Sequence, residues 1–277
     1  MSTCRGLAVA IALCMSAVSL PAQARTMTNS IGMEFVLILP GSMRVGRFAP
    51  ECPPPSHGVT TPGRAWTPAD HARCAEMAKR DASPGFLVTI ARSYYIGRFE
   101  VTQGDWKRLM GTNPSVFQGD RVTGDADRHP VDNVSWDDTQ TFLRRLNAAD
   151  TSAHYRLPTE FEWEYAARAG ATAEPSWQAI RASAWEQDVD LGTTHAVGGK
   201  QPNAWGLFDI LGNVWEWVSD FYNERLFADF LPSPAGSTHV LKGGSFASDV
   251  KNTTWSTHAG GPGSGFDVGF RIVREVR

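Results

Sequence analysis

Apolar and polar residues alternate over several short stretches near the start of the chain, which predicts strands there. Residues 31–39 are mostly apolar and end at the pair Pro40-Gly41, and residues 42–46 form a second alternating run. Two such runs on either side of Pro-Gly are typical of two strands separated by a turn. Alternation resumes over residues 86–95, where we expect a further strand.

Three short helices are predicted after residue 102, each following a polar residue that can cap its first turn. The third is marked most clearly, because Thr159 and Glu162 have the spacing of a capping box and Gly170 can end the helix. The second carries a single apolar stripe that can face a core. The first helix is expected over 103–110, with Thr102 as its N-cap and Gly111 at its end. The second helix has Ser135 as its N-cap, and its stripe consists of Phe142, Leu143 and Leu146.

The rest of the chain consists mostly of short strands and loops. It shows no internal repeat, and no linker divides it. The chain contains 26 Gly and 10 Trp in 277 residues. This composition favours one loop-rich domain held together by large aromatic side chains.

The first 24 residues have the pattern of a secretory signal peptide. Arg5 is followed by an apolar stretch over 6–20 and by Ala22-Gln23-Ala24, a small-x-small cleavage site. A lipoprotein signal at Cys14 is the alternative, but the bulky Leu13 disfavours it. The apolar stretch is too short for a membrane span. We therefore expect a periplasmic or secreted protein that starts near Arg25.

The mature chain would be mildly acidic, because 25 Lys and Arg remain against 29 Asp and Glu after Arg5 is removed, a net charge of −4. This balance argues against nucleic acid and against anionic membrane surfaces as partners. The same cleavage removes two of the four cysteines and leaves Cys52 and Cys74. An even pair in an oxidising compartment predicts a Cys52–Cys74 disulfide, with two free thiols as the alternative.

The most informative stretch is Gly206–Asp220, which reads GLFDILGNVWEWVSD. Together with eight segments that follow the family's order, it resembles the formylglycine-generating-enzyme family, also called the sulfatase-modifying-factor family. The resemblance extends over 31–273 and is interrupted by a Pro- and Ala-rich insertion at about 48–84, in which we expect a short helix near 69–79. The other matching segments are 32–37, 100–106, 113–115, 129–137, 155–170, 202–208, 243–246 (GGSF) and 269–274 (GFRIVR).

This resemblance implies an α+β fold related to C-type lectins, with little regular secondary structure, forming one domain over 25–277. It also implies that the two strands within residues 31–46 form an N-terminal hairpin. Arg271, in the closing GFRIVR run, is expected to be a buried structural guanidinium rather than a substrate clamp. Trp136, Phe161, Trp163 and Tyr165 are expected to be core anchors.

The resemblance also locates the catalytic positions of the family. Members that oxidise a cysteine use two copper-binding cysteines, five residues apart, just after the GGSF-type turn. The matching positions here are Ser248 and Thr253. Copper(I) needs soft thiolate ligands, which hydroxyls do not replace. We therefore expect no catalytic residues of this kind, no copper and no formylglycine-generating activity.

Family structures carry structural calcium, and one such site maps onto Asp209, Gly212, Val214 and Glu216. Two carboxylates and two backbone carbonyls are hard oxygen ligands that suit Ca²⁺. The alternative is that Asp209 and Glu216 only hydrogen-bond to loop amides. The family's second calcium site does not match residues 183–190 and is not expected here.

These observations favour an exported accessory module that binds another protein of the periplasm or cell envelope, for example as its partner or inhibitor. The alternative is a cysteine-independent oxidative tailoring enzyme, like the exported family branch implicated in pyoverdine maturation. Variable loops on a rigid frame suit binding. The candidate binding surface contains Trp185, Trp255, His258 and Phe266, although the aromatic residues could instead fill the core.

Overall fold

The computed structural model describes residues 26–46, 67–82, 85–173, 175–187, 192–226, 230–249, 253–261 and 263–276. The expected signal peptide lies outside these residues, and so does Cys52, so the Cys52–Cys74 disulfide stays a prediction. Within the described part of the chain, none of the helices combines the length and the apolar character needed to cross a membrane.

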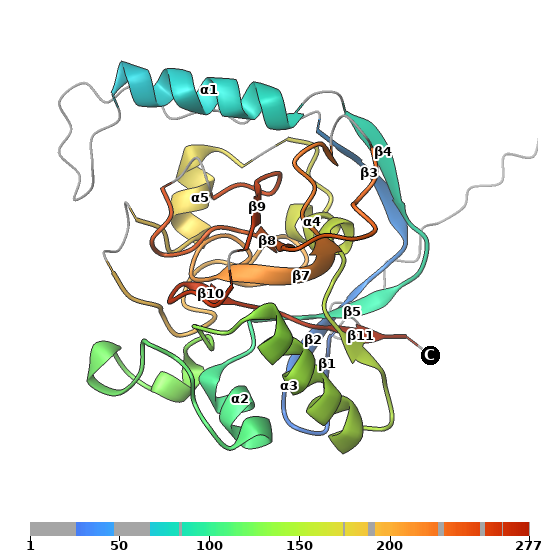
Figure 1. Ribbon diagram of the computed structural model, residues 1–277, viewed down its shortest axis with the longest axis vertical. Helices are drawn as coiled ribbons and strands as arrows, with labels where there is room; N and C mark the ends of the chain where they lie inside the picture. Colours follow the sequence, from blue (N-terminus) through green and yellow to red (C-terminus); the bar gives the residue numbers. More distant parts are fainter. Residues whose placement is uncertain are drawn as a thin grey trace, which may run out of the picture.

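Short strands of the described residues form three sheets, of which the β3–β4 pair runs along one edge of the molecule (Figure 1). A five-stranded sheet has the order β1-β2-β5-β11-β6, a four-stranded sheet has the order β10-β7-β8-β9, and β3 pairs with β4. The strands are β1 (Thr26–Thr28), β2 (Glu34–Ile38), β3 (Gly41–Val45), β4 (Phe86–Ile90), β5 (Tyr94–Gly97), β6 (Tyr155–Arg156), β7 (Trp215–Phe221), β8 (His239–Lys242), β9 (His258–Gly260), β10 (Val268–Gly269) and β11 (Val273–Glu275).

The prediction that the two strands within residues 31–46 form a hairpin with each other is wrong. β2 and β3 do not pair with each other. Instead β2 pairs with β5, and β3 pairs with β4, so residues 34–45 run antiparallel to residues 86–97 along one bent ribbon. Pro40-Gly41 bends the ribbon rather than reversing the chain. The true reversal lies beyond Val45 and Phe86, which pair at the end of the ribbon, so the insertion forms the tip of this longer hairpin.

All three predicted helices are present with the expected caps. α2 (Gln103–Met110) begins after Thr102 and ends at Gly111, and α3 (Trp136–Ala149) begins after Ser135. α4 (Glu160–Arg168) has the predicted capping box of Thr159 and Glu162. The insertion contains α1 (Pro68–Ala82), and the other helices among the described residues are η2 (Gly119–Arg121), η3 (Ala126–Arg128) and α5 (Trp177–Ser183). In Figure 1, α2 and α3 lie below β7 and β10, whereas α4 and α5 lie above these two strands.

Large aromatic side chains fill the interior, as the composition predicted. Trp163 from α4 and Trp217 from β7 are both almost completely buried, in two neighbouring apolar clusters. Trp136, Phe161 and Tyr165 are only partly buried and pack against these clusters. The interior also contains fully buried charged side chains, among them Arg271 and Lys242. These charges require partners inside the protein, and their partners define the sites described next.

Candidate functional site

The turn at residues 243–248 holds Ser248, the first of the two positions predicted to match the family cysteines. Gly243 and Gly244 have φ values of +93° and +78°, which glycine adopts without strain. Two hydrogen bonds between Ser245 and Ser248 stabilise the following turn. Ser248 N–H donates to the Ser245 carbonyl (3.0 Å), and Ser245 N–H donates to Ser248 Oγ (3.0 Å). Ser245 Oγ in turn donates to Asp267 Oδ2 at 2.7 Å.

Both matching hydroxyls therefore take part in holding loops. Ser248 is 7% exposed and its Oγ accepts a backbone hydrogen bond, whereas Thr253 is fully buried and its Oγ1 donates to the Asp249 carbonyl at 3.1 Å. Neither hydroxyl contacts a histidine within the described residues. A serine or threonine without a neighbouring base is a weak nucleophile.

A buried acidic cluster lies beside the strand β7. Glu216 accepts four short contacts, three from Arg271 (2.7–2.9 Å) and one from Trp163 Nε1 (2.7 Å). Arg271 also donates to the carbonyls of Gly97, Phe208 and Asp209. This geometry confirms the expectation that Arg271 is a buried structural guanidinium.

Two further carboxyl groups share this interior. Glu100 accepts from Asn213 Nδ2 (2.7 Å) and from Val214 N–H (3.2 Å). Burial raises the pKa of Glu100 well above its ordinary value, and the carboxylates of Asp209 and Glu216 raise it further. Three carboxyl groups thus face a single guanidinium. If all three were ionised the cluster would carry a net charge of −2, which a buried site needs protons or a cation to offset.

Asp209 carries the one carboxylate oxygen in this cluster that lacks a partner. Its Oδ2 accepts from Gly198 N–H at 2.6 Å, but its Oδ1 is buried and has no hydrogen-bond partner among the described residues. Asp209 has a φ of +50°, a left-handed conformation that is uncommon for a residue other than glycine. Burial raises the pKa of Asp209 to about 6. An unsatisfied buried oxygen is costly, so Oδ1 is a candidate ligand for a cation.

The expected calcium ligands fit this geometry unequally. Asp209 suits the ion, because it offers a free buried oxygen. Glu216 does not offer one as arranged, because the four contacts described above occupy the usual acceptor positions of a carboxylate. It could bind calcium only if Arg271 gave up some of its bonds. No group of three or more His, Cys, Asp and Glu side chains suited to a metal occurs in the described part of the chain.

A second buried charge network surrounds Lys242, which sequence reasoning missed. Its Nζ lies 3.2 Å from Glu164 and 3.7 Å from Glu160. Glu164 also pairs with Arg168, and Glu160 lies 3.2 Å from His258 Nδ1. The four-residue spacing of Glu160 and Glu164 on α4 was a visible signal, since it places both on one helix face beside Trp163.

Of the four residues in the candidate binding surface, two have buried side chains. Trp255 is 7% exposed and belongs to the apolar core, and the His258 side chain, also 7% exposed, lies in the charge network. The interpretation of these two as surface residues is therefore wrong. Trp185 is half-buried, stacks on His195 at 3.8 Å and lies 4.3 Å from the Lys200 ammonium.

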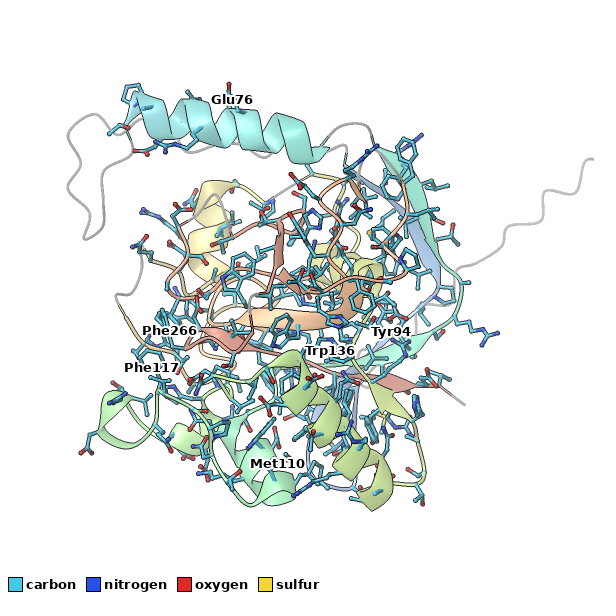
Figure 2. All side chains as sticks on the ribbon, viewed as in Figure 1. Glu76, Tyr94, Met110, Phe117, Trp136 and Phe266 are labelled. Atoms are coloured by element: carbon cyan, nitrogen blue, oxygen red, sulfur yellow. The ribbon has the colours of Figure 1, made fainter. Side chains whose placement is uncertain are left out.

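Phe266 is the one member that is clearly exposed, at 51%. Figure 2 shows it next to Phe117 at one edge of the molecule, and their ring centroids are 6.3 Å apart. The buried ring of Phe246, from the GGSF turn, packs against both. An exposed aromatic side chain supported by two further rings is a rigid contact for a partner.

Two hollows open on the surface of the described residues. One, of about 550 Å³, lies between β2 and α2 and has Glu100 in its wall together with the ion pair of Lys107 and Asp127. The other, of about 420 Å³, follows β4 and the bend after it. Both are open and lined by polar and apolar groups, and neither encloses Ser248 or Thr253.

Comparison with known proteins identifies relatives of the whole fold. The family profile of the sulfatase-modifying factor enzyme 1-like domain matches residues 22–276. The chaperone protein LppX of Paenibacillus barcinonensis is 29% identical over 238 residues, which cover 65% of this chain and 80% of LppX. The formylglycine-generating enzyme of Mycobacterium tuberculosis is 32% identical over 233 residues, 68% of this chain and 75% of that enzyme. The chain matches smaller shares, down to 41%, of other formylglycine-generating enzymes.

Among solved structures, PvdO from Pseudomonas aeruginosa superposes with a TM-score of 0.65 at 22% identity, over 91% of this chain and 98% of PvdO. At that identity the similarity establishes the fold alone. It confirms the expected α+β domain with little regular secondary structure.

Proposed function

This chain belongs to the sulfatase-modifying factor enzyme 1-like family, and we propose that it is an exported accessory module that binds another protein, with Ser248 and Thr253 in place of the cysteines of the family's oxidases. The observation that carries this proposal is the bonding of the two hydroxyls. Ser248 Oγ closes its own turn and the buried Thr253 Oγ1 donates to a backbone carbonyl. Neither is placed to exchange with a substrate thiol or to bind copper.

The similarity to LppX, whose name describes it as a chaperone, supports assistance to another exported protein as the form of this binding. A rigid frame with exposed loops suits such a role, because the loops can vary while the core remains unchanged. The supported ring of Phe266 is one contact that this surface offers. The partner is expected in the periplasm or cell envelope, the compartment to which a signal peptide at residues 1–24 would direct the chain.

A structural calcium ion forms a second part of the proposal. The free buried oxygen of Asp209 and the excess of negative charge in the cluster support it. Asp209 would hold the ion with the carbonyls of Gly212 and Val214, and Glu216 would join on partial release of Arg271. The ion would offset buried charge and fix the loop before β7, and no chemical step is assigned to it.

Loss of oxidase chemistry is tested with the purified mature protein. It is incubated with a cysteine peptide of the sulfatase type, copper and oxygen, and the aldehyde product is sought by mass spectrometry. We expect no product above a copper-only control. Turnover above that control would falsify the non-oxidase assignment, and oxidation of a different group would favour the tailoring-enzyme alternative.

Accessory binding is tested with an aggregating client. Reduced insulin is allowed to precipitate in the presence of equimolar mature protein, and light scattering is followed over time. We expect delayed scattering, with an unrelated exported protein of similar charge as the control. If scattering is unchanged, and cross-linking in living cells yields no stoichiometric envelope partner, the proposed function is wrong.

A further inference from the structure

The outer edge of β4 has no strand partner. β4 pairs on one side with β3, and no other described segment forms a backbone hydrogen bond with residues 86–92. In an antiparallel pair, alternate residues direct their N–H and C=O groups away from the partner strand. β4 therefore presents a row of free donors and acceptors, which is the template that an added strand requires.

The outer edge of β4 lacks a strand partner because of where β4 lies along the bent ribbon. β5 continues β4 along the bent ribbon, and on the edge away from β2 it pairs with β11. That pairing runs from Val273 opposite Ile96 to Glu275 opposite Tyr94. Beyond Tyr94 the ribbon continues as β4, but no described strand continues β11. The bent ribbon thus has an open place beside β4, in line with β11.

The hollow of about 420 Å³ lies along the unpaired edge of β4. Residues 88–94 form one wall, and the opposite wall comes from Arg156, from the first turn of α4 and from Val276. Its apolar side chains include Val88, Ile90, Phe161 and Val276. Figure 2 places Tyr94, at the end of this wall, on the side of the molecule where Figure 1 shows β11.

The charges around the hollow balance. Arg156 donates to Glu162 at 2.6 and 2.8 Å and to Glu275 at 2.9 Å. The only other charged lining residue is Arg92, so two cations face two carboxylates. A lining of this kind offers no net attraction to a charged ligand and favours an uncharged one.

An apolar surface extends the hollow toward the far end of β4. Phe86 packs edge-on against Phe161 at 5.8 Å and against Phe230 at 5.4 Å. Phe230 is 44% exposed and Leu231 is 69% exposed. Phe230 has a φ of +58°, an uncommon conformation for a bulky residue. The apolar strip thus borders the same edge that carries the free backbone groups.

We propose that the outer edge of β4 binds an extended, uncharged, apolar segment of a partner protein by strand addition. The backbone groups would provide the pairing, and the hollow would receive alternate apolar side chains. Residues 86–92 provide room for about seven residues at roughly 3.4 Å each. This inference rests on the proposed function, because it identifies the surface that holds the partner.

The test uses a fluorescent heptapeptide of alternating Thr and Val with blocked ends, bound to the full mature chain and followed by anisotropy. Two further peptides are N-methylated at odd or at even positions. We expect only one of these two to lose binding, by at least tenfold, because strand addition uses amides on one edge only. Hydrogen exchange should slow within residues 86–92 when the parent peptide binds. Absence of binding, or equal binding by both methylated peptides, overturns the proposal.

Variants locate the site. T89K and A91K place a lysine at exposed positions in the wall of the hollow, and both should weaken binding at least tenfold. S42K is the matched control, because Ser42 is exposed, lies opposite Thr89 on β3 and bonds to it, but does not line the hollow. It should change affinity less than twofold. Equal losses in S42K and T89K would contradict edge binding.

The same experiments distinguish a partner protein from other segments that could bind the β4 edge, and they distinguish failure of this docking site from failure of the proposed function. A concentration-dependent dimer that T89K abolishes would assign the edge to a second copy of this chain. Tighter peptide binding after deletion of residues 48–66 would assign it to the insertion. Either result overturns the partner assignment. If T89K binds no peptide but still suppresses insulin aggregation, the accessory function stands without this docking site.

Discussion

Replacing Arg271 with methionine should be severely destabilising at neutral pH. Methionine keeps an apolar side chain of similar length but removes the one guanidinium that faces Glu100, Asp209 and Glu216. It also removes the donors to the carbonyls of Gly97, Phe208 and Asp209. Breaking a buried ion pair by removing one member costs about 3–5 kcal/mol, because the other charge stays buried.

The magnitude can be measured by urea unfolding at pH 7.5, in chelator so that metal binding does not contribute. A loss of about 4 kcal/mol would lower the melting temperature of a domain of this size by roughly 8–16 °C. The double variant R271M/E216Q is the decisive comparison. Because the glutamine amide removes one of the carboxylates left without a cation beside the methionine, this variant should be more stable than R271M alone. A loss below about 1 kcal/mol for R271M, or additive losses in the double variant, would refute the role assigned to this pair.

Three further predictions concern the cation site and the cysteines. Calcium at one hundred times its dissociation constant should stabilise the native chain by about 2.7 kcal/mol; D209N should lose most of this gain and D267N should keep it, and an equal gain in D209N would exclude the site. In chelator, the raised pKa of Asp209 means that the folded state retains a proton which the unfolded state releases at lower pH. The wild type should therefore lose stability relative to D209N as pH rises from about 4 to about 6, and parallel stability curves would contradict this. Intact-mass analysis with thiol alkylation should find Cys52 and Cys74 paired, and in the chain-entropy account the bond contributes about 3 kcal/mol; two alkylated thiols without prior reduction would exclude it.

Local features of the fold were predictable from the sequence, because their causes are local. Thr102, Ser135 and Thr159 cap their helices through side-chain oxygens that bond to an amide three residues later. Such a motif is complete within four residues and can be identified without knowledge of the fold. The family resemblance provided the fold class for the same reason, since its eight segments are each contiguous.

Features that depend on distant partners were not predictable in this way. Residues 34–45 pair with 86–97 across the insertion, and nothing near Pro40 distinguishes a bend from a reversal. Trp255 was equally compatible with surface and core until its neighbours were known. Arg271 could be identified as structural, but its bonding to Glu216 and the third carboxyl group at Glu100 required coordinates.

The placement of the insertion at the tip of the ribbon has a consequence for how this protein can change over time. The register of the ribbon is set by residues 34–45 against 86–97, and no described strand or helix packs extensively against α1. The closure entropy of such a tip rises only with the logarithm of its length, about 0.6 kcal/mol per doubling. Descendants of this chain can therefore lengthen, shorten or exchange this segment at little thermodynamic penalty. The tip is a natural point for acquiring a new module while the fold beneath it is inherited unchanged.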